Sequence, residues 1–121
     1  MDSTTTVVLR YRDGRTERAS LNETDVDQQI VRVKRDDGAN DDVPFSTLKA
    51  IFFPRNASDE NLEEPAGSTI AVEFADGEVI RGLAQYNPER NGFFLFPLDR
   101  SKNDRIFVVN SAIVSIEVEK L

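Results

Sequence analysis

The chain contains no cysteine, no histidine and no tryptophan. Without thiols and imidazoles it can form no disulfide and no usual zinc site, and it lacks the side chain that most often moves protons near neutral pH. No apolar run approaches the ~18 residues of a membrane helix, and Met1 is followed by Asp2 and a Ser/Thr run instead of a basic and then apolar leader. These absences predict a cytoplasmic protein with no membrane segment, no cofactor and no metal.

Positive charge is also scarce. The formal net charge is −7, from 15 Lys and Arg against 22 Asp and Glu. An acidic surface repels phosphate backbones, so nucleic acid is disfavoured as a partner unless a local basic patch exists.

What the chain does contain is an internal similarity. The segment TVVLRYRDG at residues 6–14 matches TIAVEFADG at residues 69–77 in its apolar pattern and in its Asp-Gly pair. The similarity continues to the end of each copy, through Leu48 and Ile51 in the first and Ile113 and Ile116 in the second. It predicts a duplication with a first repeat at residues 1–53, an acidic linker at residues 54–67 and a second repeat at residues 68–121.

Each copy has the pattern of short strands. Val7, Leu9 and Tyr11 alternate with period two, and Asp-Gly is a strong hairpin turn. Three further strands and a tight turn before a short last strand follow, and no helical periodicity extends over a useful length. The order predicts an all-β fold made of two tandem five-stranded SH3-like or Sm-like small barrels.

The third strand of the second copy, Phe93 to Leu98, does not alternate at all. Aligned with the first copy at the same offset of 63 residues, Phe94 and Phe96 fall on the apolar Val31 and Val33 and are expected to face the core. Phe93, Leu95 and Pro97 would then replace a charged outer face and need a cover. Three covers remain open, namely the other copy, a second molecule in a homo-oligomer, or a separate partner.

The loop before this strand is the best candidate for a partner contact. Tyr and Arg are the side chains that most often anchor interfaces. The loop holds Tyr86, Asn87 and Arg90, and Phe93 and Leu95 lie beside it. These five residues form the predicted partner-binding surface, although a loop whose Tyr86 simply packs on the barrel end is the structural alternative.

Two family resemblances follow from these segments. Tyr11-Arg12-Asp13-Gly14, with LKAIFF at residues 48–53, resembles an uncharacterised bacterial small-domain family that opens with a YxDG hairpin. That resemblance implies a regulatory or interaction module and carries no catalytic residues. The strand order and the Asp-Gly hairpin also resemble the Sm-like fold, which implies RNA binding through loops nearest Tyr86-Asn87 and Asn110-Ser111. These positions depart from that family's basic and glycine pattern.

No catalytic constellation is visible. No nucleophile has a base near it in sequence, no Gly-rich phosphate loop is present, and the DDGANDD loop at residues 36–42 lacks the ligand spacing of a calcium loop. The sequence therefore predicts a non-enzymatic interaction or adaptor module that binds a protein partner. The alternative is an Sm-like RNA-binding protein.

Overall fold

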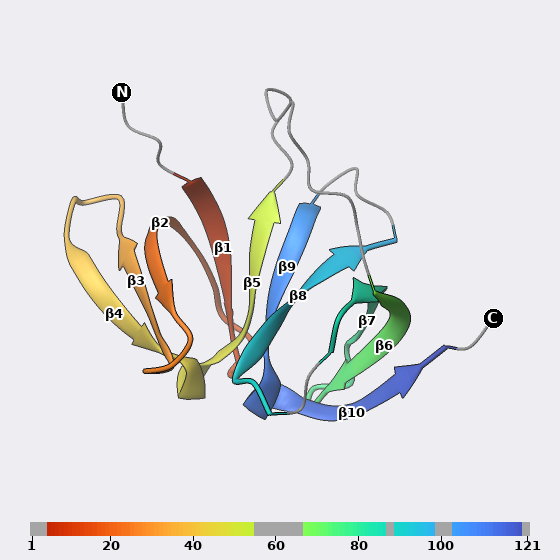
Figure 1. Ribbon diagram of the computed structural model, residues 1–121. Coiled ribbons are helices and arrows are strands. Elements are labelled where there is room, and N and C mark those ends of the chain that lie inside the picture. The colour runs from red at the N-terminus through yellow and green to blue at the C-terminus, as the bar shows by residue number, and fades with distance from the viewer. Residues whose placement is uncertain (1–4, 55–66, 87–88, 99–102, 120–121) are drawn as a thin grey trace.

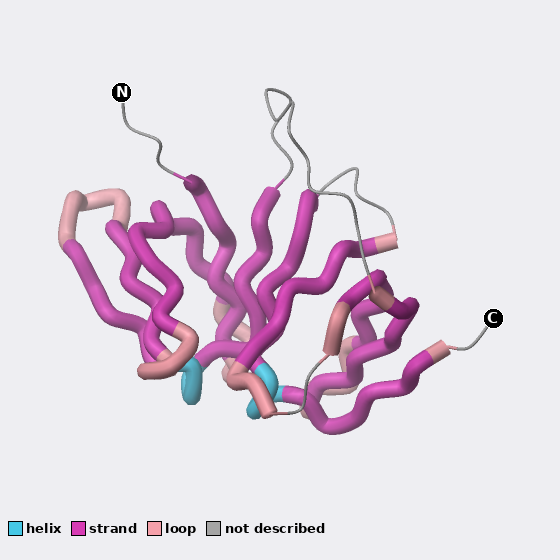
Figure 2. The backbone as a smooth tube through the Cα atoms, in the orientation of Figure 1, coloured by secondary structure: helices cyan, strands magenta, loops and turns pink. Residues whose placement is uncertain are grey.

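The computed structural model describes residues 5–54, 67–86, 89–98 and 103–119. Over these residues the chain forms ten strands and two short 3₁₀ turns, so the prediction of an all-β fold is confirmed (Figure 2). The elements are β1 (Thr5–Tyr11), β2 (Thr16–Asp25), β3 (Ile30–Lys34), β4 (Asn40–Pro44), η1 (Phe45–Thr47), β5 (Leu48–Pro54), β6 (Ser68–Phe74), β7 (Val79–Ala84), β8 (Gly92–Pro97), β9 (Asn103–Val109), η2 (Asn110–Ala112) and β10 (Ile113–Val118).

All ten strands belong to one antiparallel sheet with the order β10-β6-β7-β8-β9-β5-β1-β2-β3-β4. In Figure 1 the sheet is strongly curved, and its two end strands, β4 and β10, lie on opposite sides of the molecule. The predicted pair of five-stranded barrels is not what forms. β5 pairs with β9 of the other half instead of with β4 of its own half, so the sheet runs on and does not close.

The two Asp-Gly hairpins form where the sequence predicts them. Gly14 and Gly77 have φ values of +96° and +90°, a region that glycine enters at no steric cost. The hairpins close in the same way, since the Tyr11 N–H donates to the Arg15 carbonyl and the Phe74 N–H donates to the Glu78 carbonyl. Each hairpin sets the register of the strand pair that it joins.

One hydrophobic core runs through both halves. β5 lies near the centre of the sheet, and its residues from Leu48 to Phe53 are all buried. Phe45 packs against Phe107 with ring centroids 5.7 Å apart, and Phe53 packs against Phe94 at 5.8 Å. Three possible covers were expected for the apolar strand β8. The structure shows one of them, because the other half of the same chain packs against this strand.

The predicted faces of β8 hold only in part. Phe96 is buried, as predicted, but Phe93 and Leu95, which were expected on the outer face, are buried as well, and Phe94 is 42% exposed. The first half carries a bulge between Leu21 and Glu23, where β2 pairs with β3. The extra residue shifts the alignment of the two halves, and a one-residue slip exchanges the faces of a strand.

The predicted linker at residues 54–67 lies mostly outside the described residues, which stop at Pro54 and resume at Gly67. The two 3₁₀ turns lie next to each other at the same end of the central strands (Figure 2). None of the described segments is a helix of the length and hydropathy that crossing a membrane would require.

Candidate interaction surface

A groove of about 670 Å³ runs beside β10, the last strand of the sheet. Its walls come from the β2–β3 turn, the loop before β8, η2 and β10 itself. The residues that line it are Gln29, Tyr86, Glu89, Arg90, Asn91, Asn110, Ser111, Ile113, Val114, Ser115, Ile116 and Val118.

Tyr86 and Arg90, two of the five predicted partner-binding residues, both lie on this groove. The Tyr86 ring stands edge-on to Phe93 with centroids 5.3 Å apart, so buried Phe93 supports Tyr86 from the core side. Leu95 has no exposed surface at all, and its predicted part in the contact surface is wrong because β8 presents its other face. Asn87 lies outside the described residues.

The loop that carries Tyr86 and Arg90 is fastened to two other elements. The Asn91 side chain donates a hydrogen bond to the Val26 carbonyl at 2.9 Å. Asn110 donates twice to the loop, from its backbone N–H to the Asn91 carbonyl at 2.9 Å and from its side chain to the Arg90 carbonyl at 2.7 Å. These bonds hold the backbone at Arg90 in place, as a preorganised contact residue requires.

β10 adds a feature that the sequence analysis missed. Only β6 pairs with it among the described strands, so its outer edge is open. Val114 and Val118 are 63% and 53% exposed. An open edge with apolar side chains offers unpaired backbone groups to a further strand. The signal in the sequence was the apolar spacing of Ile113, Ile116 and Val118, which the repeat aligns with Leu48, Ile51 and Phe53.

At the opposite end of the sheet, β4 borders another groove, of about 470 Å³, whose lining includes several charged side chains. Arg35 contacts both Glu17 and Asp41, and the Tyr11 hydroxyl donates to Glu17 at 2.8 Å. Burial, followed by the hydrogen bond to Glu17, raises the pKa of Tyr11. The hydrogen bond from Arg35 lowers the pKa of Asp41. The polar groups of this cluster therefore form their hydrogen bonds and ion pairs with one another.

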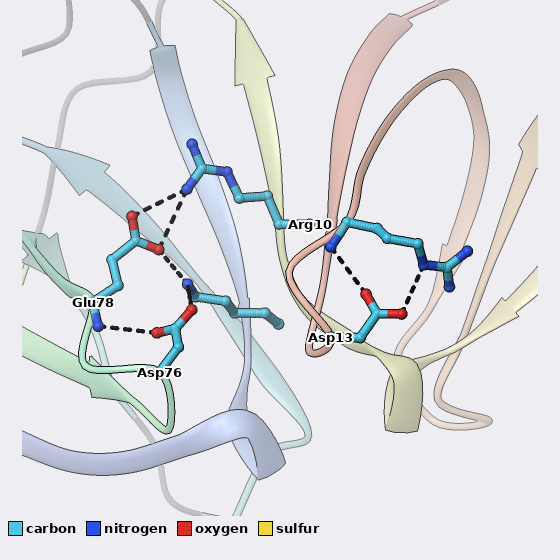
Figure 3. Close-up of polar contacts among 6 residues, drawn as sticks. Arg10, Asp13, Asp76 and Glu78 are labelled. Carbon is cyan, nitrogen blue, oxygen red and sulfur yellow. Dashed lines mark hydrogen bonds and ion pairs between the residues drawn. The ribbon is translucent and has the colours of Figure 1, made fainter.

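A second polar cluster joins the two halves across the β5–β9 junction (Figure 3). Lys49 of β5 is buried, and its ammonium contacts Asp76 at 2.7 Å and also Glu78. Arg10 of β1 contacts Glu78 at 3.0 Å and lies over the Phe52 ring. The hydrogen bond from Lys49, together with the Glu78 backbone N–H, lowers the pKa of Asp76.

These carboxylates neutralise a buried cation, which is a structural task. Lys49 is not among the residues predicted from the sequence, although one signal was present. The two hairpins have the sequences Asp-Gly-Arg at residues 13–15 and Asp-Gly-Glu at residues 76–78. The second hairpin thus has the anionic Glu78 where the first has Arg15. Within the described part of the chain, no group of three or more metal-ligating side chains comes together.

Comparison with known proteins places the chain in a family. The model of a family of unknown function, DUF6982, matches residues 3–120. The chain belongs to the DUF6982 family. This agrees with the resemblance to an uncharacterised small-domain family at the level of the family, and the match spans both halves of the DUF6982 sheet. No curated protein and no solved structure matches the chain.

Proposed function

We propose that this DUF6982 protein is a non-enzymatic protein–protein interaction module, an adaptor or regulatory domain of the bacterial cytoplasm. Its contact surface is the outer edge of β10 together with the groove beside it. The observation that carries the proposal is the coincidence, on one groove, of an open, apolar strand edge with Tyr86, whose ring packs on Phe93, and Arg90, whose backbone carbonyl is hydrogen-bonded. Strand addition at such an edge supplies affinity through the backbone, and neighbouring side chains supply selectivity.

We also propose that the sheet arose by duplication of a five-stranded, SH3-like or Sm-like unit. Each half has its last strand beside its first, in the orders β5-β1-β2-β3-β4 and β10-β6-β7-β8-β9. Both pairs of first and last strands carry a bulge at the same place, after Leu48 in one half and after Ile113 in the other. Under this proposal β10 corresponds to β5, which makes the bare edge of β10 the counterpart of a surface that is covered in the first half.

An enzymatic role is disfavoured by what the polar groups do. Asp76 and Glu78 hold Lys49, and Glu17 and Asp41 hold Arg35. A general acid or base needs a pKa near the operating pH, whereas the hydrogen bonds from Arg35 and Lys49 lower the pKa values of Asp41 and Asp76 further. The Sm-like alternative has no further support, because the side-chain amide of Asn110 is bonded to the loop backbone.

The test is capture of partners by the tagged protein from a low-salt lysate of its own host, with proteins read by mass spectrometry. Arg90→Ala and Tyr86→Ala should each remove a specific partner. Arg18→Ala is the matched control, because Arg18 is an exposed arginine on β2, in the other half of the sheet. Partners that persist in all three variants would contradict the proposal. Bound RNA that disappears on nuclease treatment would replace it with the Sm-like alternative.

A further inference from the structure

We propose that the strand which pairs with β10 is β10 of a second copy, so that two chains form a two-fold symmetric dimer with one sheet running through both. This inference rests on the proposed function, which makes the β10 edge the contact surface, and it names the occupant of that edge. Three properties of the described residues support it: the precedent at β5, the pattern of the β10 edge and the state of the opposite edge.

The precedent is the junction inside the chain. β5 pairs with β1 on one side and, antiparallel, with β9 on the other. β10 pairs with β6 in the same way as β5 pairs with β1, with Ile116 opposite Val72 as Ile51 is opposite Leu9. The second side of β10 has no strand on it within the described part of the chain. A strand added there would repeat a junction that this protein already uses.

The hydrogen-bonding direction of β10 shows which residues a new strand would meet. The Glu119 N–H donates to the Thr69 carbonyl of the β6 segment at 2.8 Å. In an antiparallel pair the bonded residues alternate, so Glu117 also points its backbone groups toward β6. Ile116 and Val118 therefore point theirs outward, to the open edge.

The side-chain pattern around Ile116 is self-complementary. The segment Val114-Ser115-Ile116-Glu117-Val118 is symmetric in polarity about its central residue. An antiparallel copy centred there sets Ile116 opposite itself, Val114 opposite Val118, and Ser115 opposite Glu117. No like charges face each other in this register, whereas a centre at Glu117 would oppose two carboxylates. A palindromic edge is what an isologous interface requires.

The other free edge, β4, is unsuited to pairing. Asp41 and Asp42 stand in the middle of β4, and Pro44 ends it and lacks a donor. Charges and proline on an outer strand are the usual means by which proteins prevent edge pairing. The charged side chains on that side, Arg35, Glu17 and Asp41, already pair with one another.

A head-to-tail chain of molecules is also disfavoured by register. If β10 met β4 as β5 meets β9, Glu117 would lie opposite Asp41, because Phe52 lies opposite Ile106. The same arrangement would bring Arg15 toward Glu73, which does not remove the repulsion within the ladder. One open edge and one protected edge lead to a closed dimer and not to a filament.

Charge gives the dimer a distinctive salt dependence. Each chain carries a formal net charge of −7, so two chains repel each other over long range. The contact strip itself is mainly apolar. Added salt screens the repulsion, and dimerisation should strengthen as ionic strength rises.

The absence of cysteine allows a direct test. Ile116→Cys should cross-link to a dimer under mild oxidation, because the two-fold axis places position 116 opposite itself at a distance that a disulfide spans. Val79→Cys is the matched control, since Val79 is an exposed valine on β7, and under the same oxidation it should give no disulfide-linked dimer. Light scattering across an about hundredfold range of concentration should show the wild-type dimer. Val118→Lys and Val114→Lys should shift it to a monomer whose circular dichroism is unchanged.

Three results would overturn the inference. A wild-type monomer throughout that range is one, and equal cross-linking at positions 116 and 79 is another. The third is cross-linking between Asp42→Cys and Ile116→Cys chains, which would establish head-to-tail pairing. A wild-type monomer whose captured host protein is lost in Val118→Lys would leave the proposed function intact. A monomer whose captured proteins do not respond to Val118→Lys would remove both.

Discussion

Lys49 and the two carboxylates that contact it come from different halves of the sheet. Neutralising the carboxylates should lower the stability of the fold more than neutralising Lys49 does. The Lys49 side chain is 7% exposed, whereas the side chains of Asp76 and Glu78 are 48% and 36% exposed. Asp76→Asn with Glu78→Gln leaves the Lys49 ammonium without an opposing charge in a site that water barely reaches. Lys49→Met leaves two carboxylates that water can still hydrate, and it keeps most of the apolar stem.

The structure sets the expected magnitudes. Breaking a fully buried pair costs about 3–5 kcal/mol, and the exposure of the carboxylates reduces that to about 2–4 kcal/mol for the Asp76→Asn/Glu78→Gln variant. Lys49→Met should cost about 1 kcal/mol or less, because Met fills nearly the same volume. For a chain of this size, the loss expected for the Asp76→Asn/Glu78→Gln variant lowers the melting temperature by roughly 10 °C.

The assay is thermal and urea unfolding followed by circular dichroism. Adding Lys49→Met to the double variant should restore most of the lost stability, since the stranded charge is then gone. Asp13→Asn in the other hairpin is the matched control, because Asp13 pairs with the exposed Arg15 and its loss should cost far less stability than the double variant. If the triple variant is no more stable than the double, the idea that an unpaired Lys49 charge causes the loss is refuted.

Three further outcomes are expected from the same measurements. Leu95→Ala should cost about 2–5 kcal/mol through a core cavity, and Phe94→Ala on the exposed face clearly less; equal losses would mean that the faces of β8 are misassigned. Gly82→Ala should destabilise the sheet strongly, because a Cβ there would lie 2.3 Å from the Phe96 carbonyl oxygen. The folded-state pKa of Asp76 is below its unfolded value, so its contribution is complete above about pH 4 and is lost as pH falls. Below pH 4 the free energy of unfolding should therefore fall less steeply with decreasing pH in Asp76→Asn than in the wild type. An equal slope in the two proteins would contradict this.

Local pattern was enough to predict the strands and both hairpins. Alternating apolar residues in β1 and the Asp-Gly turns depend on neighbours in sequence, and the structure has both. The faces of β8 could not be predicted in the same way. They depend on the bulge between Leu21 and Glu23, which consumes one residue and leaves no compositional trace.

Long-range pairing was beyond the sequence. Nothing in LKAIFF indicates that its second edge belongs to β9 and not to its own half, so two closed barrels were predicted where one open sheet forms. Because long-range pairing could not be predicted, only part of the candidate surface was predicted from the sequence. Tyr86 and Arg90 follow from residue type within a loop, but the open edge of β10 exists only because the sheet ends there.

The β5–β9 junction also determines the order in which the protein can be completed during synthesis. Ala50 pairs with Val108, so β5 has to wait for the last quarter of the chain. At roughly 5–20 residues per second, the edge of β5 stays bare for about 3–10 s after it emerges from the ribosome. Throughout that interval an apolar strand is available to other nascent chains. Lys49 is the one charged residue of β5. Before Lys49 is buried in its ion pairs, its charge opposes aggregation of the exposed strand.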